Sequence, residues 1–217
     1  MNGLGTVRDV VPRIAALPMY DFPDLMEAHD ALWTALAEAL IEGGLAHVPL
    51  GLTRDLDYRD VWCHPSLLFG QACEYPIAKS FGEYVTLVAT PRYSAPGCEE
   101  SLYRSVIVVR VENSAESLAE LRGRRCVASE PDSNSGMNLL RAAVAPLSGG
   151  ARFFASVRFS GSHRRSVEIV AANEADVTAV DCVTFAHLRK SHPELIEKVR
   201  VLCWSPPSPS LPFVTAR

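Results

Sequence analysis

Apolar positions along the chain follow two patterns: short β-branched runs, and longer runs with apolar residues three or four apart. Residues 105–111 (SVIVVRV) are nearly all β-branched, which is typical of a strand buried on both faces. Residues 25–41 place Leu25, Leu32, Leu36 and Leu40 on one helical stripe. Asp21 or Asp24 can cap this helix, and the glycines at 43–44 end it.

The same patterns predict an alternation of strands and helices along the rest of the chain. Strands are expected at 14–19, 47–50, 85–89, 125–129, 153–159, 176–180 and 199–204. Helices or helical turns are expected at 65–72, 117–121, 136–147, 163–172 and 182–190. Such alternation indicates βαβ units, a largely parallel sheet and therefore the α/β class. The last residues, 211–215, look like the start of a strand, so we expect a missing C-terminal segment or an unusually short chain of its kind.

Two Ser-rich turns, Ser133-Asn134-Ser135-Gly136 and Ser160-Gly161-Ser162-His163, each follow a predicted strand and open a predicted helix. A helix N-terminus presents free backbone N–H groups and a positive dipole end, which suits an anion. Hydroxyl and amide side chains add donors, and glycine lets the backbone approach closely. Two such turns predict a site that grips one small oxyanion from two sides. Plain N-capping is the alternative explanation of each turn, because Ser and Asn are preferred caps.

Three further residues follow predicted strands and are candidates for the same site. Asp181 ends a strand at the carboxyl edge, where open α/β sheets place ligands. An acid beside an anion makes sense only if it accepts a proton from a protonated ligand oxygen or binds an amine; capping the helix at Cys182 explains it equally well. Tyr20 and Tyr93 each carry a phenol that can donate toward the same cleft.

Bulk composition narrows the class of protein. At 217 residues the chain fits one large or two small domains, and 48% hydrophobic with 21% charged residues predicts a packed core. The formal net charge of −4 argues against a general nucleic-acid binder. No run approaches the length of a membrane span. The N-terminus (MNGLGTVRDVVPRIAALPMYDFP) lacks a continuous apolar region and an A-x-A-like cleavage site, so we expect no secretory signal.

Recognised catalytic and metal-binding motifs are missing from the sequence. It contains no G-x-S-x-G elbow, no P-loop, no G-x-G-x-x-G and no convincing Ser/His/Asp set. The six cysteines form no C-x-x-C pair, and zinc ligation by Cys63, His64 and Cys73 matches no recognised spacing. We therefore expect no metal and no cofactor, and a protein that holds an anion rather than transforms it.

Seven short motifs in order resemble those of the phosphate/phosphite/phosphonate-type substrate-binding proteins of ABC transporters. They are Leu17-Pro18-Met19-Tyr20, the block Trp62…Pro65-x-Leu67-Leu68…Gln71-x-Cys73-x-Tyr75-Pro76, Ala89-Thr90-Pro91-x-Tyr93, Asp132-Ser133-x-Ser135-Gly136-Met137-Asn138, Gly161-Ser162-His163-x-x-Ser166, Ala175-Asp176-Val177-x-Ala179-Val180-Asp181 and Leu211-Pro212-Phe213. The resemblance implies a two-lobed type 2 periplasmic-binding-protein fold, in which two strands cross between the lobes and the ligand lies in the cleft. Residues 1–92, completed by 200–217, would form lobe 1, and 93–199 lobe 2 with both Ser-rich turns.

The resemblance also implies which residues contact the ligand. Carried over position by position, the set is Tyr20, Tyr93, Ser133, Asn134, Ser135, Ser162, His163 and Asp181, with Gln71 and Tyr103 as weaker candidates. A disulfide between Cys73 and Cys98 is a further implied feature. We expect two departures from the family pattern: no export signal, and no last helix or two of the first lobe.

The leading interpretation is a non-enzymatic solute-binding protein that captures a phosphonate-like or phosphate-like oxyanion for an ABC-type uptake system. Its partners would be the oxyanion and an ABC permease, with no nucleic acid, no membrane insertion and a monomeric state. The family is periplasmic, but the absent signal leaves the cytoplasm open. One alternative is a cytosolic enzyme of the same fold, similar to menaquinone-pathway dehydratases, acting on a small carboxylate through His163 and Asp181. The other is a ligand sensor.

Overall fold

A computed structural model describes residues 11–217, which fall into two units. Unit 1 comprises the described residues up to Ala72, together with Phe81–Ala89 and Phe213–Arg217; unit 2 comprises Cys73–Ser80 and Thr90–Pro212. Residues 1–10, part of the N-terminal stretch in which we expect no secretory signal, lie outside the described residues.

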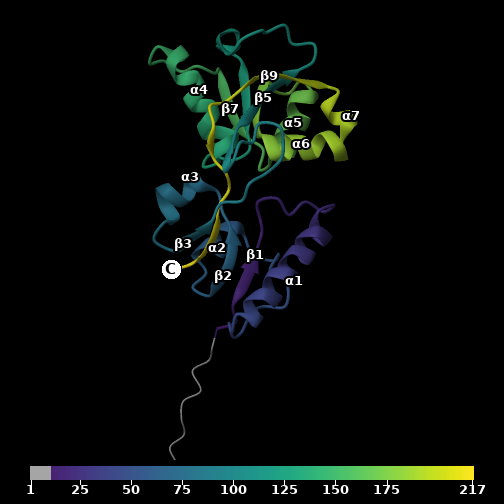
Figure 1. The fold of residues 1–217 in the computed structure, drawn as a ribbon. Coiled ribbons are helices and arrows are strands. Elements are labelled where there is room, and N and C mark those ends of the chain that lie inside the picture. Colours follow the sequence, from purple (N-terminus) through teal and green to yellow (C-terminus); the bar gives the residue numbers. More distant parts are fainter. Residues whose placement is uncertain (1–10) are drawn as a thin grey trace, which may run out of the picture. The chain divides into compact units, whose positions relative to one another are not determined.

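Unit 1 is built on a four-stranded mixed sheet with the strand order β1-β2-β11-β3 (Figure 1). The strands are β1 (Ile14–Ala16), β2 (Leu67–Gln71), β3 (Val85–Ala89) and β11 (Phe213–Ala216). β1 is parallel to β2, whereas β11 is antiparallel to both of its neighbours. The last strand of the chain therefore completes a sheet that begins near the N-terminus.

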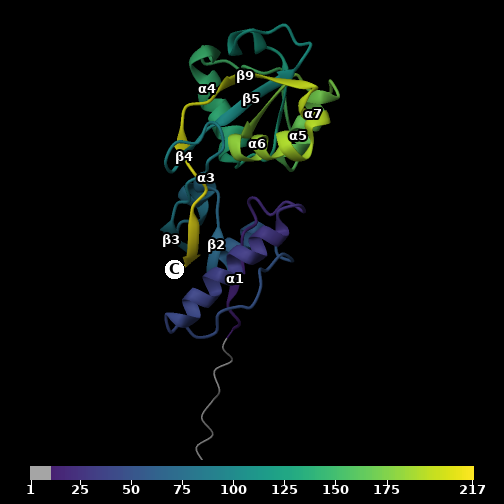
Figure 2. The same cartoon turned by 45° about the vertical axis from the view of Figure 1, so that its right-hand side comes forward.

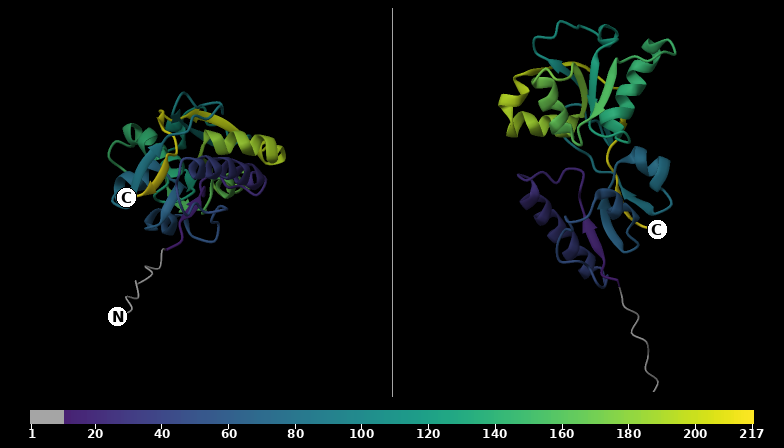
Figure 3. Two further views of the ribbon diagram at one scale, coloured as in Figure 1. Left: turned by 60° about the horizontal axis from the view of Figure 1, so that its bottom comes forward. Right: turned by 180° about the vertical axis from the view of Figure 1, so that it is seen from behind.

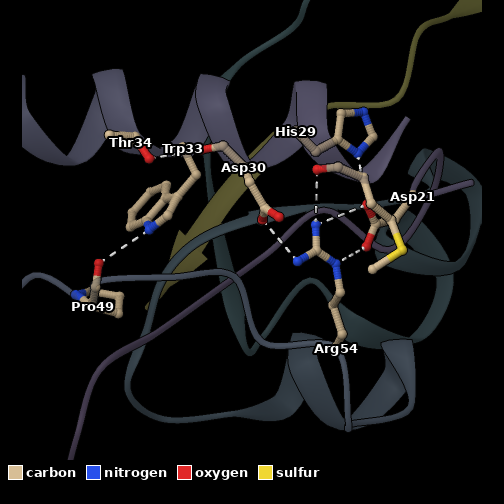
Figure 4. Close-up of polar contacts among 8 residues, drawn as sticks. Asp21, His29, Asp30, Trp33, Thr34, Pro49 and Arg54 are labelled. Carbon is tan, nitrogen blue, oxygen red and sulfur yellow. Dashed lines mark hydrogen bonds and ion pairs between the residues drawn. The ribbon is translucent and has the colours of Figure 1, made fainter. Parts of the chain in front are cut away.

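Helix α1 (Met26–Glu42) packs on this sheet through its one large buried side chain, Trp33. The indole ring lies 5.9 Å from the ring of Phe69 on β2, and its N–H donates to the carbonyl of Pro49 at 3.1 Å (Figure 4). Burying the ring and satisfying its one donor together anchor α1 to unit 1. The second helix of this unit is α2 (Tyr58–Cys63), which begins at an Asp57 cap.

The start of α1 differs from the sequence expectation. Its N-cap is Leu25, which makes no side-chain cap hydrogen bond. Asp21 instead accepts hydrogen bonds from Arg54 (2.5 Å) and His29 (3.0 Å), and Arg54 also donates to Asp30 at 2.8 Å (Figure 4). The carboxylate thus ties the 50–55 loop to the first turns of α1 rather than capping the helix.

Two other predicted elements of unit 1 are wrong. The residues expected to form a helix at 65–72 form strand β2, because Leu67–Gln71 pairs with β1 on one side and β11 on the other. The helix of this region is α2, just before the predicted one. The strand expected at 47–50 is a loop in which His47 adopts a positive φ of 57°.

Unit 2 contains a five-stranded sheet with the order β7-β6-β8-β5-β9 (Figure 2). Its strands are β5 (Ser105–Arg110), β6 (Arg125–Ala128), β7 (Ser156–Phe159), β8 (Val177–Asp181) and β9 (Val199–Trp204). β6 is parallel to β7 and β8, and β5 is antiparallel to β8 and β9. Since β9 pairs with β5, residues 200–212 lie with unit 2. A separate two-stranded ladder joins β4 (Leu102–Tyr103) to β10 (Ser208–Pro209).

Helices cover both faces of the unit 2 sheet (Figure 3). They are α4 (Leu139–Ser148), which continues a π-helical turn η3 (Asn134–Asn138), and α5 (His163–Ala171), α6 (Cys182–Ser191) and α7 (Pro193–Ile196). Smaller helical pieces are α3 (Glu74–Pro76), η1 (Ile77–Phe81) and η2 (Leu118–Leu121).

Strand β5, buried from Ser105 to Val109, contributes side chains to both faces of the sheet. Val106 and Val108 pack in the cluster that contains α5 and α6 residues. Ile107 and Val109 pack in the other cluster, with Leu140 of α4. The β-branched run predicted as a strand buried on both faces is therefore confirmed, and it forms the centre of both cores.

The disulfide expected between Cys73 and Cys98 is not present: all six cysteines, each within the described range, are free thiols. Cys98 contacts a different cysteine, Cys182, with 3.4 Å between the two Sγ atoms. Cys73 instead lies in the segment just before α3, where burial raises the pKa of its thiol to about 11.

Candidate functional site

Three helices of unit 2 begin where the parallel strands β6, β7 and β8 end, and each carries a polar N-cap. Ser133 Oγ accepts from the Gly136 N–H at 3.0 Å, before η3. Ser162 Oγ accepts from the Arg165 N–H at 3.2 Å, before α5. Asp181 Oδ1 accepts from the Thr184 N–H at 2.8 Å, before α6. Carboxyl ends of parallel strands share one edge of a sheet, so the three helix starts lie at the same edge.

At this edge the structure brings together Ser135, His163 and Asp181. Ser135 Oγ lies 3.0 Å from His163 Nε2, and the same nitrogen lies 3.4 Å from Asp181 Oδ2. The three residues come from η3, α5 and the end of β8. Three side chains predicted from the sequence as ligand-binding candidates, a hydroxyl, an imidazole and a carboxylate, are thus in contact through the imidazole.

Burial disfavours the protonated form of the His163 imidazole. Burial lowers its pKa, while the nearby charge of Asp181 and the backbone of Ala179 act in the opposite direction without cancelling that effect. Its Nδ1 atom is buried and makes no hydrogen bond of ordinary geometry within the described residues.

Gly136 allows the two helix starts to approach each other. A Cβ atom at this position would lie 3.0 Å from Ser133 Oγ and 3.1 Å from His163 Cε1, and it would overlap the hydroxyl of Ser129. The Ser129 hydroxyl is itself buried with no hydrogen-bond partner among the described residues. The glycine in this turn therefore does allow a close approach, but the groups that approach its backbone are the side chains of Ser129, Ser133 and His163.

Asn134 uses its side chain to anchor the turn to the β4/β10 ladder. Its Nδ2 donates to the hydroxyl of Tyr103 at 3.1 Å and to Ser208 Oγ at 2.9 Å, while Oδ1 accepts from Asn138 at 3.0 Å. An amide has two N–H hydrogens, so both are already used. Asn134 therefore positions the turn.

The remaining predicted residues are not members of the Ser135–His163–Asp181 cluster. Ser162 is exposed and precedes His163 directly, whereas Tyr93 is half-buried in the segment between β3 and β4. Tyr20 and the weaker candidate Gln71 are buried in unit 1. The sequence gives no signal for Ser105, whose hydroxyl donates to the Ser135 carbonyl at 2.8 Å from a strand 30 residues earlier.

The described residues contain no group of three or more His, Cys, Asp or Glu side chains arranged to hold a metal ion. Between residues 11 and 217, no helix has the length and apolar character that crossing a bilayer demands.

A profile of the family described as "ABC transporter, phosphonate, periplasmic substrate-binding protein" matches residues 67–217. This range contains the whole Ser135–His163–Asp181 cluster. Among curated proteins, none matches the chain.

Solved structures with the same fold are numerous and distant in sequence. The chain is similar to PhnD1 from Prochlorococcus marinus in complex with methylphosphonate (16% identity, TM-score 0.71, 94% of this chain and 77% of that one). It is also similar to XAC2383 from Xanthomonas citri bound to ATP (17%, 0.69, 94% and 76%). A third is the binding protein component of an ABC phosphonate transporter from Pseudomonas aeruginosa (18%, 0.67, 94% and 68%). The fold is the α/β type 2 periplasmic-binding-protein fold with mixed sheets.

Proposed function

We propose that this chain, which belongs to the family of periplasmic substrate-binding proteins of phosphonate ABC transporters, captures a small phosphonate-like or phosphate-like oxyanion at the Ser135–His163–Asp181 edge of unit 2. The observation that carries the proposal is that the Ser135 hydroxyl and the Asp181 carboxylate both lie close to one imidazole nitrogen, His163 Nε2. Proteins of this family bind and deliver substrates and are not enzymes.

Helix N-termini supply the attraction for the anion. The helices that start at Asn134 and His163 begin at the same edge of the sheet as Ser135, and the first N–H groups of a helix have no partner within the helix itself. The dipole of each helix adds positive potential there. Hydrogen bonds from such donors to a charged oxygen are stronger than bonds between neutral groups, so no paired arginine is needed.

Asp181 sets a condition on the ligand. Its carboxylate is an acceptor only, and it would repel an unprotonated anion oxygen at hydrogen-bonding distance. A monoanionic phosphonate or phosphate has a P–OH group that can donate to Asp181, while its other oxygens accept from Ser135 and the backbone. A sulfonate carries no such proton near neutral pH. We therefore expect phosphorus oxyanions to bind better than sulfonates.

The geometry disfavours an enzyme that uses His163 and Asp181. In a nucleophile–base–acid relay, the nucleophile and the acid contact different ring nitrogens, so the acid orients the ring while the base takes a proton. Here Ser135 and Asp181 contact the same nitrogen, and Nδ1 makes no ordinary hydrogen bond. The arrangement suits binding rather than proton relay.

A thermal-shift screen tests the proposal. The purified chain is heated with phosphate, phosphite, methylphosphonate, aminoethylphosphonate, sulfonates and small carboxylates. A ligand at about 100 times its dissociation constant adds roughly 2.7 kcal/mol and raises the melting temperature by several degrees. We expect a rise with phosphorus oxyanions that Ser135→Ala and His163→Ala abolish.

Ser114→Ala is the matched control, because Ser114 is an exposed serine of the same unit. Its response to phosphorus oxyanions should equal that of the parent protein. A rise in melting temperature only with carboxylates would overturn the proposal and favour an enzyme that acts on a carboxylate. No rise with any anion would refute anion capture at this site. That the ligand lies in a cleft between two lobes stays a prediction.

A further inference from the structure

Two cysteines distant in sequence meet at the start of α6. The Sγ atoms of Cys98 and Cys182, which are 84 residues apart, lie 3.4 Å from each other. Cys182 is buried, whereas Cys98 is partly exposed. A disulfide needs the sulfurs at about 2.05 Å, so the two sulfurs must come about 1.4 Å closer for the bond to form.

Backbone hydrogen bonds fix the positions of both cysteines. Cys182 is the first residue of α6, and its N–H donates to the carbonyl of Arg104 at 3.0 Å. Cys98 lies in a turn in which its own N–H donates to the Ala95 carbonyl at 2.9 Å. Both anchors belong to unit 2, so the distance between the sulfurs does not depend on how the units are placed.

The turn itself packs directly on the start of α6. Gly97 has a φ of +95°, and a Cβ atom there would overlap the ring of Trp204 and lie 3.1 Å from the Cβ of Cys182. Only glycine accommodates both this conformation and this contact. The chain therefore uses a residue without a side chain to bring Cys98 against Cys182.

We propose that Cys98 and Cys182 form a reversible disulfide, a modification site that is independent of the proposed function. The oxidant is a low-molecular-weight disulfide such as oxidised glutathione. The Cys98 thiolate attacks one sulfur of this disulfide, which gives a mixed disulfide and releases one thiol. Cys182, after losing its proton, attacks the Cys98 sulfur and releases the second thiol. Two protein thiols are oxidised and one small disulfide is reduced to two thiols, so the exchange balances.

The order of attack follows from exposure. Cys98 is the thiol that solvent reaches, and Cys182 resolves the intermediate from beneath it. Burial raises the pKa of Cys98, and burial raises the pKa of Cys182 to about 12. Since thiolates are the attacking species, oxidation should be slow near neutral pH and faster in alkaline buffer.

The bond would stabilise the fold, because it closes a long loop that is open in the reduced, unfolded chain. We expect the oxidised protein to melt about 5–15 °C above the reduced protein. The bond would also fix the 95–98 turn to the residue next to Asp181.

The test uses the full chain in buffers with graded ratios of reduced to oxidised glutathione. Free thiols are then trapped with N-ethylmaleimide, and cross-linked peptides are identified by mass spectrometry. We expect one internal disulfide that joins Cys98 to Cys182, together with the rise in melting temperature. A Cys73–Cys98 bond, or no internal disulfide under fully oxidising conditions, would overturn the proposal.

Variants separate the cross-link from general oxidation. Cys98→Ser should abolish both the linked peptide and the temperature difference between oxidised and reduced samples. Cys63→Ser should retain both, because Cys63 is an exposed thiol of unit 1. The peptide map of the parent protein decides the question even where a variant fails to fold.

Discussion

One methyl group added at Gly136 should damage both the stability of unit 2 and its candidate site. The new Cβ would lie 3.0 Å from Ser133 Oγ, 3.1 Å from His163 Cε1 and in overlap with Ser129 Oγ. Real Cβ atoms essentially never come closer than 3.0 Å to another heavy atom, so the serine hydroxyl has to move. Gly136 and Ser129 are both buried, so the displaced hydroxyl has to be accommodated within the packed interior of unit 2.

The magnitude follows from two opposing effects. Overpacking in a buried site costs about 1–3 kcal/mol. Replacing glycine by alanine within a helical turn recovers about 0.5–1 kcal/mol, because the unfolded chain loses freedom. We therefore expect Gly136→Ala to lower the free energy of unfolding by up to about 2.5 kcal/mol. The ring of His163 should also be pushed away from Ser135, so oxyanion binding should weaken at least tenfold.

Urea unfolding followed by far-UV circular dichroism measures the first effect, and ligand titration measures the second. Gly51→Ala is the control: a Cβ there meets nothing within 4 Å, and the residue does not have a positive φ. This control should be as stable as the parent protein or slightly more stable. If Gly136→Ala unfolds at the same urea concentration as the parent and binds oxyanions equally well, the close approach of the two helix starts is not what holds the site.

Two further predictions concern titrating groups. Burial alone would raise the pKa of Asp21, but hydrogen bonds from Arg54 and His29 outweigh burial and lower that pKa. The carboxylate therefore stabilises the fold at pH values above the unfolded-state pKa of about 3.9. This stabilisation is lost as the pH falls through the folded-state pKa. Urea midpoints should drop more steeply below pH 4 in the parent than in Asp21→Asn, and parallel curves would contradict this. Asp181→Asn should lower the pKa of His163 further, because the carboxylate raises it; an NMR titration of the imidazole that shows a higher pKa would contradict the assigned contact.

The sequence predicts most elements of unit 2 because local patterns and tertiary packing agree there. The run at 106–109 is β-branched and buried on both faces, so its propensity and its environment lead to the same strand. The sequence does not predict the strand at 67–71, because LLFGQ is short and apolar and such a run suits a helix and a strand equally. Pairing with β1 and β11 decides its form, and β11 lies near the other end of the chain.

The same limit applies to the site. Capping preferences identify Ser133, Ser162 and Asp181 from the sequence, because each needs only its own helix. The contact between Ser135 and His163 depends on β6 and β7 being neighbours in the sheet. The local sequence pattern does not predict strand order. The role of Asn134 depends on Tyr103 and Ser208, which lie 31 and 74 residues away.

Capping and anion binding, which compete as explanations of the Ser-rich turns, are compatible for serine. A serine cap uses a lone pair of its oxygen to accept from the helix backbone, as Ser133 and Ser162 do. The hydroxyl hydrogen is then still available to donate outward, toward an oxyanion. The Asn134 side chain has no free N–H donor for a ligand, since both of its N–H hydrogens are used. Among the predicted donors, the serines can therefore serve the helix and the ligand at once, whereas the asparagine serves the ligand only by holding the turn in place.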